Sequence, residues 1–383
     1  NMLVQEVYDL NIFIDDLNIF DAKGVIFVRA DIFESIMKPI PTCELEVSIP
    51  ISWFDYRSIV DGTKIKFSIV SKKWGIADEY TFRIYNVKKL ELNQHFVNVS
   101  IEGVIDFFDG YSHANEHNAY GLSSEVFRHI ALAYGLEADI DFTNDSQLWV
   151  AGENNIYQFF NYMAQRGYIN ETSAMFWCLD RKKRLLYKNL TDLFRNRQEK
   201  IYTFVQTPTP NPSQKQFGYT SAKGSIQAGT NNLKNEGYGG TDAYFDLLTY
   251  SWKEAASRKV VAESNLINIS KELAKGLGQN WYPFDVGNLH PNYYAALKQN
   301  KRIMSTYSSY MTIESQFFQP YRLAQIVNFE YYDAQDPSNK VYALSGTYVI
   351  DAIHISMSLS SITSMVEIVM QGLNGKAKTR ETY

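Results

Sequence analysis

The sequence predicts a mainly β, α+β chain with strands at both ends and a small α/β module between them. Three observations support this fold class. Polar and apolar side chains alternate with a period of two in the first hundred residues, the period lengthens to 3.6 between residues 121 and 166, and alternation returns after residue 315. At 383 residues the chain exceeds the usual size of one domain. Its 27 tyrosines and 23 phenylalanines favour strands and interfaces.

Four segments of the first hundred residues are predicted to be half-buried strands, because one set of alternating side chains is apolar and the other polar. Asp61-Gly62 and Asn93-Gln94 are turn signals beside them. Short antiparallel strands at this spacing favour a barrel or a sandwich. The predicted strands are residues 44–49, 64–69, 80–87 and 96–103.

Residues 121–166 predict a helix, a short strand and a second helix. Ser123 or Ser124 is expected to cap the first helix, and Gly135 to end it in a left-handed conformation. A strand near 138–142 follows, and then a helix from about Glu153 to Arg166, ended by Gly167 in the same way. The residues expected to face the core are Val126, Phe127, Ile130 and Tyr134 in the first helix, and Ile156, Phe159, Phe160 and Met163 in the second.

Residues 175–179 and 185–187 predict a hairpin around the turn 180–183, and residues 200–206 a further strand. Residues 206–243 are rich in Pro, Gly, Asn, Ser and Thr, which predicts a linker or a long exposed loop. Helices are expected at 252–275 and 292–304. A final antiparallel sheet is predicted from strands at 324–331, 344–355 and 362–370, with turns at 336–339 and 358–361.

The chain offers no constellation of catalytic residues. His113 and His117 have the i, i+4 spacing of a zinc-binding helix, but Gly110, Asn115 and Asn118 around them favour a connecting loop. Cys178 lies in an apolar strand segment, which favours an inert thiol over a nucleophile. Acidic pairs such as Asp15-Asp16 are common and do not by themselves indicate a glycosidase. The sequence therefore predicts no enzyme, no metal and no cofactor.

Charge is distributed unevenly along the chain. The net charge is −5, which argues against a dedicated nucleic-acid binder. Residues 1–60 hold ten acidic and four basic residues, whereas residues 181–200 hold eight basic and two acidic ones. Three readings stay open: solvated faces, complementary contacts between subunits, or an acidic surface that repels a polyanion.

Two cysteines, Cys43 and Cys178, do not make a disulfide framework or a metal site. No window approaches the roughly 20 apolar residues of a membrane helix, so no membrane insertion is expected. The N-terminus lacks the basic and apolar regions of a secretory signal. These features predict a protein that folds in a cytoplasm.

Residues 121–190 also carry an ordered set of features that resembles a known module. The set consists of a helix ending at Gly135, the segment 143–149 (Thr-Asn-Asp-Ser-Gln-Leu-Trp), an aromatic helix followed by Gly167-Tyr168, and a hairpin with Trp177 and Tyr187. It resembles the central module of contractile-tail phage baseplate hub proteins and of the related hub region in type VI secretion spike proteins. The ends of the chain are similar to the two barrels of such hubs: residues 61–66, 83–85 and 97–105 to the first, and residues 348–354 and 367–371 to the second.

The resemblance implies two antiparallel β-barrels with an inserted α/β module. It implies a first barrel at 1–110, the module at 111–199, strands and a loop of the second barrel at 200–230, an extended loop and helical insertion at 231–314, the rest of the second barrel at 315–372 and a tail at 373–383. Trp149, Phe160, Gly167, Tyr168 and His354 are the family-motif residues, and each is expected to be structural.

The resemblance implies a structural baseplate hub subunit of a phage tail. Three copies would form a pseudo-sixfold ring that joins the tail tube to the central spike and leaves a bore for DNA. The expected partners are its own copies, tail tube proteins, the central spike protein and other baseplate proteins, while DNA passes without specific binding. The expected location is the tail baseplate of the virion, after assembly in the host cytoplasm.

Two alternatives stay open. The first is a hub component of a type VI secretion or other contractile injection apparatus, whose bore need not pass DNA. Such injectors often fuse the spike to the hub, and the short segment after the last predicted strand favours a separate spike and hence the phage reading. The second alternative is a tail-associated glycan hydrolase.

Overall fold

The structure is a computed structural model, and strands dominate it. It describes residues 8–56, 59–111, 118–152, 154–170, 173–195, 201–226, 241–246, 250–256, 279–285, 309–332, 334–336, 338, 340–341 and 344–370. The predicted mainly β, α+β class is confirmed. No helix in the described part of the chain is both long enough and apolar enough to span a membrane. His113, His117, the predicted helix at 292–304 and the tail at 373–383 lie outside the described residues.

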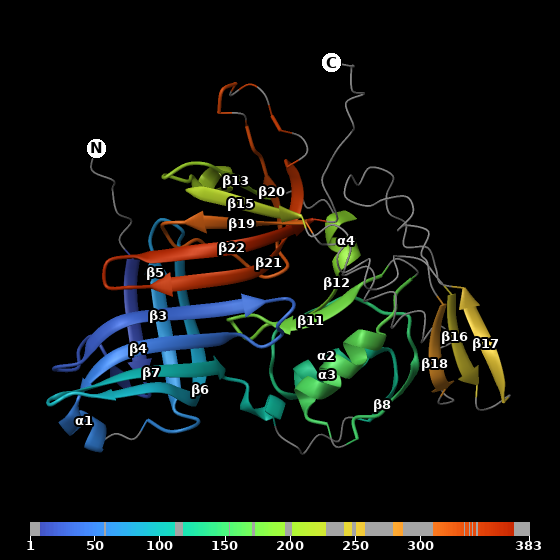
Figure 1. Ribbon diagram of the computed structural model, residues 1–383, viewed down its shortest axis with the longest axis horizontal. Coiled ribbons are helices and arrows are strands. Elements are labelled where there is room, and N and C mark those ends of the chain that lie inside the picture. The colour runs from blue at the N-terminus through green and yellow to red at the C-terminus, as the bar shows by residue number, and fades with distance from the viewer. Residues whose placement is uncertain are drawn as a thin grey trace.

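The first β-region is an antiparallel sheet with the strand order β3-β4-β7-β6-β5-β1-β2. Strands β1 and β5 run across the direction of β3 and β4, so the sheet is strongly bent (Figure 1). A short helix that the sequence did not predict, α1 (Ile51–Tyr56), follows β4. The strands are β1 (Tyr8–Ile14), β2 (Leu17–Asn18), β3 (Ile26–Ser35), β4 (Thr42–Pro50), β5 (Lys64–Ser71), β6 (Ile76–Leu92) and β7 (Phe96–Ile105).

Alternation of side chains explains why these segments form strands. On β4 the residues Cys43, Leu45 and Val47 are fully buried, while the residues between them face outward. The two turn signals are also confirmed. Gly62 has a φ of 86°, and the amide of Asn93 donates to the carbonyl of Phe96 across the β6–β7 turn.

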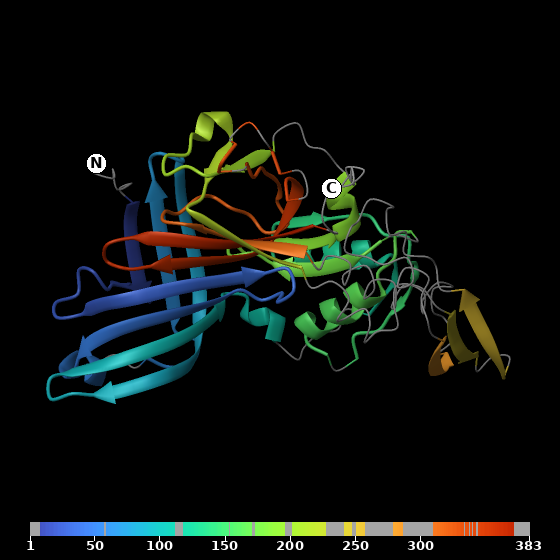
Figure 2. The same cartoon turned by 45° about the horizontal axis from the view of Figure 1, so that its top comes forward.

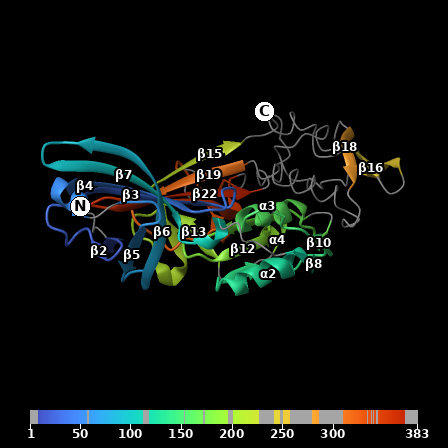
Figure 3. The same cartoon turned by 90° about the horizontal axis from the view of Figure 1, so that it is seen from below.

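The central part has the predicted order of helix, strand, helix and hairpin. Helices α2 and α3 lie side by side against a three-stranded sheet with the order β11-β12-β9, in which β9 is parallel to β12 (Figures 1 and 3). Two short strands, β8 and β10, pair beside the helices. The elements are η1 (Phe108–Tyr111), β8 (Ala119–Gly121), α2 (Ser123–Ala133), β9 (Ala138–Ile140), β10 (Gln147–Trp149), α3 (Ile156–Arg166), β11 (Met175–Leu179), β12 (Leu185–Asn189) and α4 (Leu190–Arg195).

The helix ends differ in part from prediction. Gly135 has the expected left-handed φ, at 64°, but Gly167 has a φ of −60° and a ψ of 137°, so the predicted left-handed stop is wrong there. Helix α2 begins at Ser123 itself, so neither Ser123 nor Ser124 is its N-cap. The second helix begins at residue 156 rather than 153 because the Asn155 side chain accepts a hydrogen bond from the amide of Gln158.

The second β-region contains the branch β15-β19-β22-β21. Strand β20 lies beside the first half of β21, followed by β13 and β14. The elements are β13 (Tyr202–Val205), η2 (Pro212–Gln214), β14 (Gln216–Gly218), β15 (Ser221–Ile226), β19 (Ser309–Ser315), β20 (Ile326–Phe329), β21 (Gly346–Met357) and β22 (Ile362–Met370). Its predicted strands at 200–206, 324–331, 344–355 and 362–370 are therefore confirmed, with shifted ends.

Two predictions between residues 206 and 275 are wrong. The expected loop at 206–243 contains β14 and β15, which join the second β-region. The expected helix at 252–275 begins instead as a strand, because residues 251–256 pair one by one with residues 241–246. Cross-strand pairing outweighs the local helix propensity of the Ala and Glu residues there. The small sheet has the order β17-β16-β18, with β16 (Thr241–Asp246), β17 (Ser251–Ala256) and β18 (Gln279–Asp285).

Strand β21 joins the two β-regions, since residues 352–357 pair antiparallel with β3. Figure 2 shows β22 and β21 continuing the stack of β3 and β4. The result is one 14-stranded sheet with free ends, so the two predicted barrels are not closed in the described structure. Buried apolar side chains of both β-regions and the central module belong to one core cluster.

The two β-regions repeat the same topology. The order β3-β4-β7-β6, with β5 beside the first half of β6, corresponds strand for strand to β15-β19-β22-β21, with β20 beside β21. Gly62 donates its amide proton to the Ile84 carbonyl, and Ala324 donates to that of Ile350, at 2.8 and 2.9 Å. Gly62 and Ala324 both have positive φ. The chain therefore contains an internal structural repeat.

Candidate functional site: the central module and the junction of the two β-regions

The core of the central module is a stack of three aromatic rings. Phe127 of α2 lies between Phe160 of α3 and Tyr187 of β12, with ring centroids 4.5 and 3.9 Å away and rings nearly parallel. All three side chains are fully buried. Burying an aromatic ring stabilises the fold by about 1.5–3 kcal/mol, so this stack fixes both helices on the sheet.

A buried carboxylate, Asp145, ties the segments of the module together. Its Oδ1 accepts hydrogen bonds from the Ser123 amide at 2.9 Å and from Thr143 Oγ1 at 2.7 Å. Its Oδ2 accepts from Ser123 Oγ at 2.5 Å and from the Tyr168 amide at 3.1 Å. Because Ser123 is the first residue of α2, a carboxylate from a distant segment caps this helix, which also suits the positive end of the helix dipole.

Four of the five family-motif residues lie in this module, and three of them meet around Asp145 and Tyr187. Phe160 is in the aromatic stack, and the amide of Tyr168 binds Asp145. Gly167 lies so close to the Tyr187 hydroxyl that a Cβ at this position would collide with it. The fourth residue, Trp149, is fully buried and donates from Nε1 to the Gly121 carbonyl at 2.9 Å.

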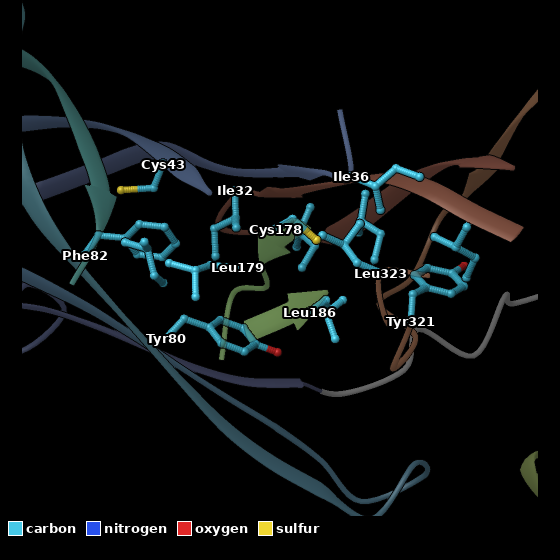
Figure 4. Packing of buried hydrophobic residues seen from close by; sticks show 14 of the residues in the cluster. Ile32, Ile36, Cys43, Tyr80, Phe82, Cys178, Leu179, Leu186, Tyr321 and Leu323 are labelled. Atoms are coloured by element: carbon cyan, nitrogen blue, oxygen red, sulfur yellow. The ribbon is translucent and has the colours of Figure 1, made fainter. Parts of the chain in front are cut away.

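The turn of the β11–β12 hairpin inserts between the two β-regions. Arg181 donates to Glu34 of β3 from its amide at 2.6 Å and from Nη1 at 2.5 Å, and to the Tyr321 carbonyl from Nη2 at 2.7 Å. Burial raises the pKa of Glu34, and the Arg181 guanidinium offsets this only in part. Figure 4 shows Leu179 and Leu186 of this hairpin among side chains of both β-regions. The hairpin therefore fastens the module to both regions.

The fifth family-motif residue, His354, lies apart from the others, at the junction of β21 and β3. Its Nε2 is 2.8 Å from Asp31 Oδ1, and its ring stacks on Phe33 with centroids 4.4 Å apart. Burial raises the pKa of Asp31, but hydrogen bonds from His354 and Ser356 outweigh burial and hold it below its ordinary value. His354 and Asp31 thus join the two β-regions by a polar contact.

An acidic row crosses the outward face of the first β-region. Asp31, Glu44 and Glu102 stand directly opposite one another on β3, β4 and β7, and Glu46 lies next to them. Two basic residues, Arg29 and Lys88, bridge these carboxylates at 3.4–3.9 Å. Like charges directly opposite on neighbouring strands destabilise a sheet, so the row is a feature that folding alone does not favour.

A second pair of carboxyl groups lies in the second β-region. Asp351 is buried at the bulge of β21, and a hydrogen bond connects it to Glu367 of β22. Burial and the neighbouring Glu367 carboxylate raise the pKa of Asp351 to about 8. Asp351 therefore holds a proton near neutral pH.

In the described part of the chain, the two thiols are buried and most basic side chains near position 180 are paired. Cys43 and Cys178 are free and fully buried, and burial raises the pKa of both thiols. No group of three or more His, Cys, Asp or Glu side chains with metal-binding geometry occurs among the described residues. The basic residues after position 180 are largely paired: Lys182 with Asp78, Arg184 with Asp180 and Lys188 with Asp139 and Asp141.

Sequence reasoning missed the residues that hold the parts together. Asp145 lies inside the segment 143–149 that carries the resemblance, but its role as the cap of α2 depends on a contact 22 positions away. Glu34 and Arg181 are separated by 147 positions, and no local signal connects them.

Comparisons with solved structures identify the fold. The tail protein from Neisseria meningitidis MC58 superposes with a TM-score of 0.56 at 8% identity, over 96% of this chain and 98% of that one. The 43 kDa tail protein of prophage MuSo2 from Shewanella oneidensis gives 0.58 at 9% identity, over 95% and 99%. A chain of the lidded Francisella PdpA–VgrG complex gives 0.52 at 9% identity, over 100% of this chain and 55% of that one.

No protein-family model and no curated protein matches the chain. At 8–9% identity the solved structures establish the fold and leave activity open. The resemblance to baseplate hub proteins is confirmed at this level. The chain has the fold of these two tail proteins, which a chain of the PdpA–VgrG complex shares.

Proposed function

We propose that this chain is a structural hub subunit of a phage tail baseplate, and that it is not an enzyme. The internal repeat is the observation that supports this function best. A ring of three copies with two equivalent β-regions each has six equivalent units around a threefold axis. Such a ring matches a sixfold tail tube on one side and a threefold spike on the other.

The other assignments follow from this function. The partners are two further copies, the tail tube, the central spike and other baseplate proteins, and the location is the virion tail after assembly in the host cytoplasm. The chain divides at 110 and 199 into a first barrel and a module, and the second barrel takes in 200–230 and 315–372, with the insertion at 231–314 between them. The two barrels close only when three copies assemble into the ring.

The acidic row supports an orientation for the subunit in the ring. If the outward face of β3, β4 and β7 lines the bore, then Glu44, Glu46 and Glu102 face the DNA that passes through, and Asp31 lies buried beside them. Their carboxylates repel phosphates, so DNA slides without the counterion release that produces tight binding. This role also accounts for like charges that the sheet would otherwise not favour.

Charge reversal tests this orientation. In particles that carry Glu44→Lys with Glu102→Lys, we expect normal rings by light scattering but delivery of DNA reduced about tenfold or more, because a basic bore retains phosphates. Glu79→Lys is the matched control, since Glu79 lies on the β5–β6 hairpin and is paired with Lys66. Unchanged delivery by the double variant would remove the bore assignment and leave the hub assignment standing.

A hub of a contractile secretion apparatus is the second candidate, and the superposition on a chain of the PdpA–VgrG complex favours it. Its bore need not carry DNA. In such a machine the same double charge reversal would leave secretion unchanged, which separates the two candidates.

Incubation with peptidoglycan tests the proposal that the chain is not an enzyme, and release of soluble fragments would overturn that proposal.

A further inference from the structure

The internal repeat shows how one β-region is joined to the next. In the second region, the first half of β21 pairs with β20, and its second half, residues 352–357, pairs with β3. A bulge between Ile350 and Ala352 separates the two halves. In spatial order, β3 is the first of the four strands β3-β4-β7-β6, and β21 is the fourth of β15-β19-β22-β21. The junction therefore joins the fourth strand of one repeat to the first strand of the other.

Strand β6 is the counterpart of β21 and has the same two halves. Its first half pairs with β5 up to Arg83, and a bulge between Ile84 and Asn86 follows. Beyond the bulge β6 pairs with β7 alone among the described residues, so one of its edges is unoccupied there. The half with the open edge carries Leu90 and Leu92, which are 48% and 72% exposed. In Figure 3 the β6–β7 hairpin extends away from the central module.

Strand β15 is the counterpart of β3 and also has an open edge. It pairs with β19 on one side and with no other described strand. Open strand edges are templates for pairing with another chain, and an apolar edge is especially prone to it. In the described part of the chain, β6 and β15 thus have open edges of different kinds, and the repeat shows how such edges fit together.

We propose that the second half of β6 pairs antiparallel with β15 of a second copy of this chain, in the way that β21 pairs with β3 within one copy. The interface is head-to-tail, because each copy offers β6 to one neighbour and β15 to the other. Three copies then have six junctions of one kind, three within chains and three between them. This interface rests on the proposed ring and names the surfaces that close it.

The register follows from the repeat. Within the chain, Met357 pairs with Ala30, Ser356 with Asp31, and Ile355 with Ile32. A residue of β6 corresponds to a residue of β21 when their partners on β7 and β22 correspond. By this rule the counterparts of residues 357, 356 and 355 are Leu92, Glu91 and Leu90. Paired positions on β4 and β19 make Ala222, Lys223 and Gly224 the counterparts of residues 30, 31 and 32.

The resulting pairs between copies are chemically complementary. Glu91 faces Lys223 of the second copy, an acid opposite a base on an exposed strand. Leu92 faces Ala222, and Leu90 faces Gly224, so each large apolar side chain meets a small residue. A Cβ on Gly224 would meet nothing nearer than 3.8 Å, which leaves room for Leu90 beside it.

A charge swap tests the pairing directly. Glu91→Lys alone and Lys223→Glu alone should each raise the concentration needed for ring assembly about tenfold or more, as judged by light scattering. The double variant, Glu91→Lys with Lys223→Glu, should restore assembly toward the original value. The control exchange, Lys66→Glu with Glu79→Lys, involves an exposed pair within one chain and should leave assembly unchanged.

Disulfide trapping tests the register. Leu92→Cys with Ala222→Cys should give covalent species up to a closed trimer on oxidation, because the native cysteines are buried. Leu92→Cys with Lys223→Cys places the two thiols on opposite faces and should give none. If the single charge variants form rings normally and the Leu92→Cys with Ala222→Cys variant gives no disulfide, this interface is overturned and the hub function stays intact. A chain that stays monomeric beside its tube and spike partners would overturn both.

Discussion

Arg181 and Glu34 form a buried ion pair that links the hairpin of the central module to the first β-region, with Nη1 and Oε1 2.5 Å apart. The Arg181 side chain is 4% exposed and that of Glu34 is fully buried. A second guanidinium nitrogen binds the Tyr321 carbonyl, so the same arginine also holds the second β-region. One side chain therefore connects the three parts of the chain.

Removal of Arg181 should destabilise the protein strongly. In Arg181→Met, Glu34 stays buried without its partner, and we expect the free energy of unfolding to fall by about 3–5 kcal/mol in a urea titration. Lys66→Met at the exposed pair with Glu79 is the matched control and should change it by less than about 1 kcal/mol. The double variant Arg181→Met with Glu34→Met should recover part of the loss, and a loss equal to that of the single variant would contradict this account.

Loss of the carboxylate at position 145 should destabilise the central module. Asp145→Ala leaves the amides of Ser123 and Tyr168 buried without an acceptor, and we expect a loss of about 2–4 kcal/mol. Asn155→Ala, which removes the cap of α3 at a more exposed site, should cost only about 1 kcal/mol. Chemical unfolding followed by circular dichroism compares the two, and equal losses would show that burial of Asp145 adds nothing.

Stability should fall as pH rises from about 4 to 8, through Asp351. Its pKa is raised to about 8 in the folded state, whereas in the unfolded chain it returns to the ordinary value of 3.8. Between these values the folded protein binds one more proton than the unfolded chain, so higher pH favours unfolding. Asp351→Asn should flatten this dependence by up to roughly 1.4 kcal/mol per pH unit. Thermal unfolding at pH 5, 6, 7 and 8 measures this dependence, and an unchanged slope would refute the raised pKa of Asp351.

The two repeats differ at one turn position, where glycine is expected to give a more stable fold than alanine. Gly62 and its counterpart Ala324 both have positive φ, 86° and 61°, which a Cβ disfavours. Ala324→Gly should therefore stabilise the protein by up to about 1 kcal/mol, and Gly62→Ala should destabilise it by a similar amount. Opposite shifts of the thermal midpoint are the expected result. Shifts of the same sign would show that the two turns are not equivalent.

Local sequence pattern determined the elements whose stabilising contacts are near in sequence. Alternating side chains predicted β4 and β22, and the apolar stripe at 156, 159, 160 and 163 predicted α3, because the period of a helix or strand is set by the backbone itself. The resemblance of residues 121–190 then predicted the fold that solved tail proteins share. Strand β17 was missed because pairing with β16, rather than local propensity, decides its conformation.

Only the tertiary structure decided how the parts are joined. Asp145 caps α2 from 22 positions away, Gly167 is required by the neighbouring Tyr187 hydroxyl rather than by its own φ, and Arg181 meets Glu34 across 147 positions. The pairing of β21 with β3 likewise appears only when the two β-regions meet. This pairing is also what shows that the open edge of β6, the counterpart of β21, could hold a strand. Such contacts depend on which surfaces the folded chain brings together, and the period of a local segment carries no information about its distant partner.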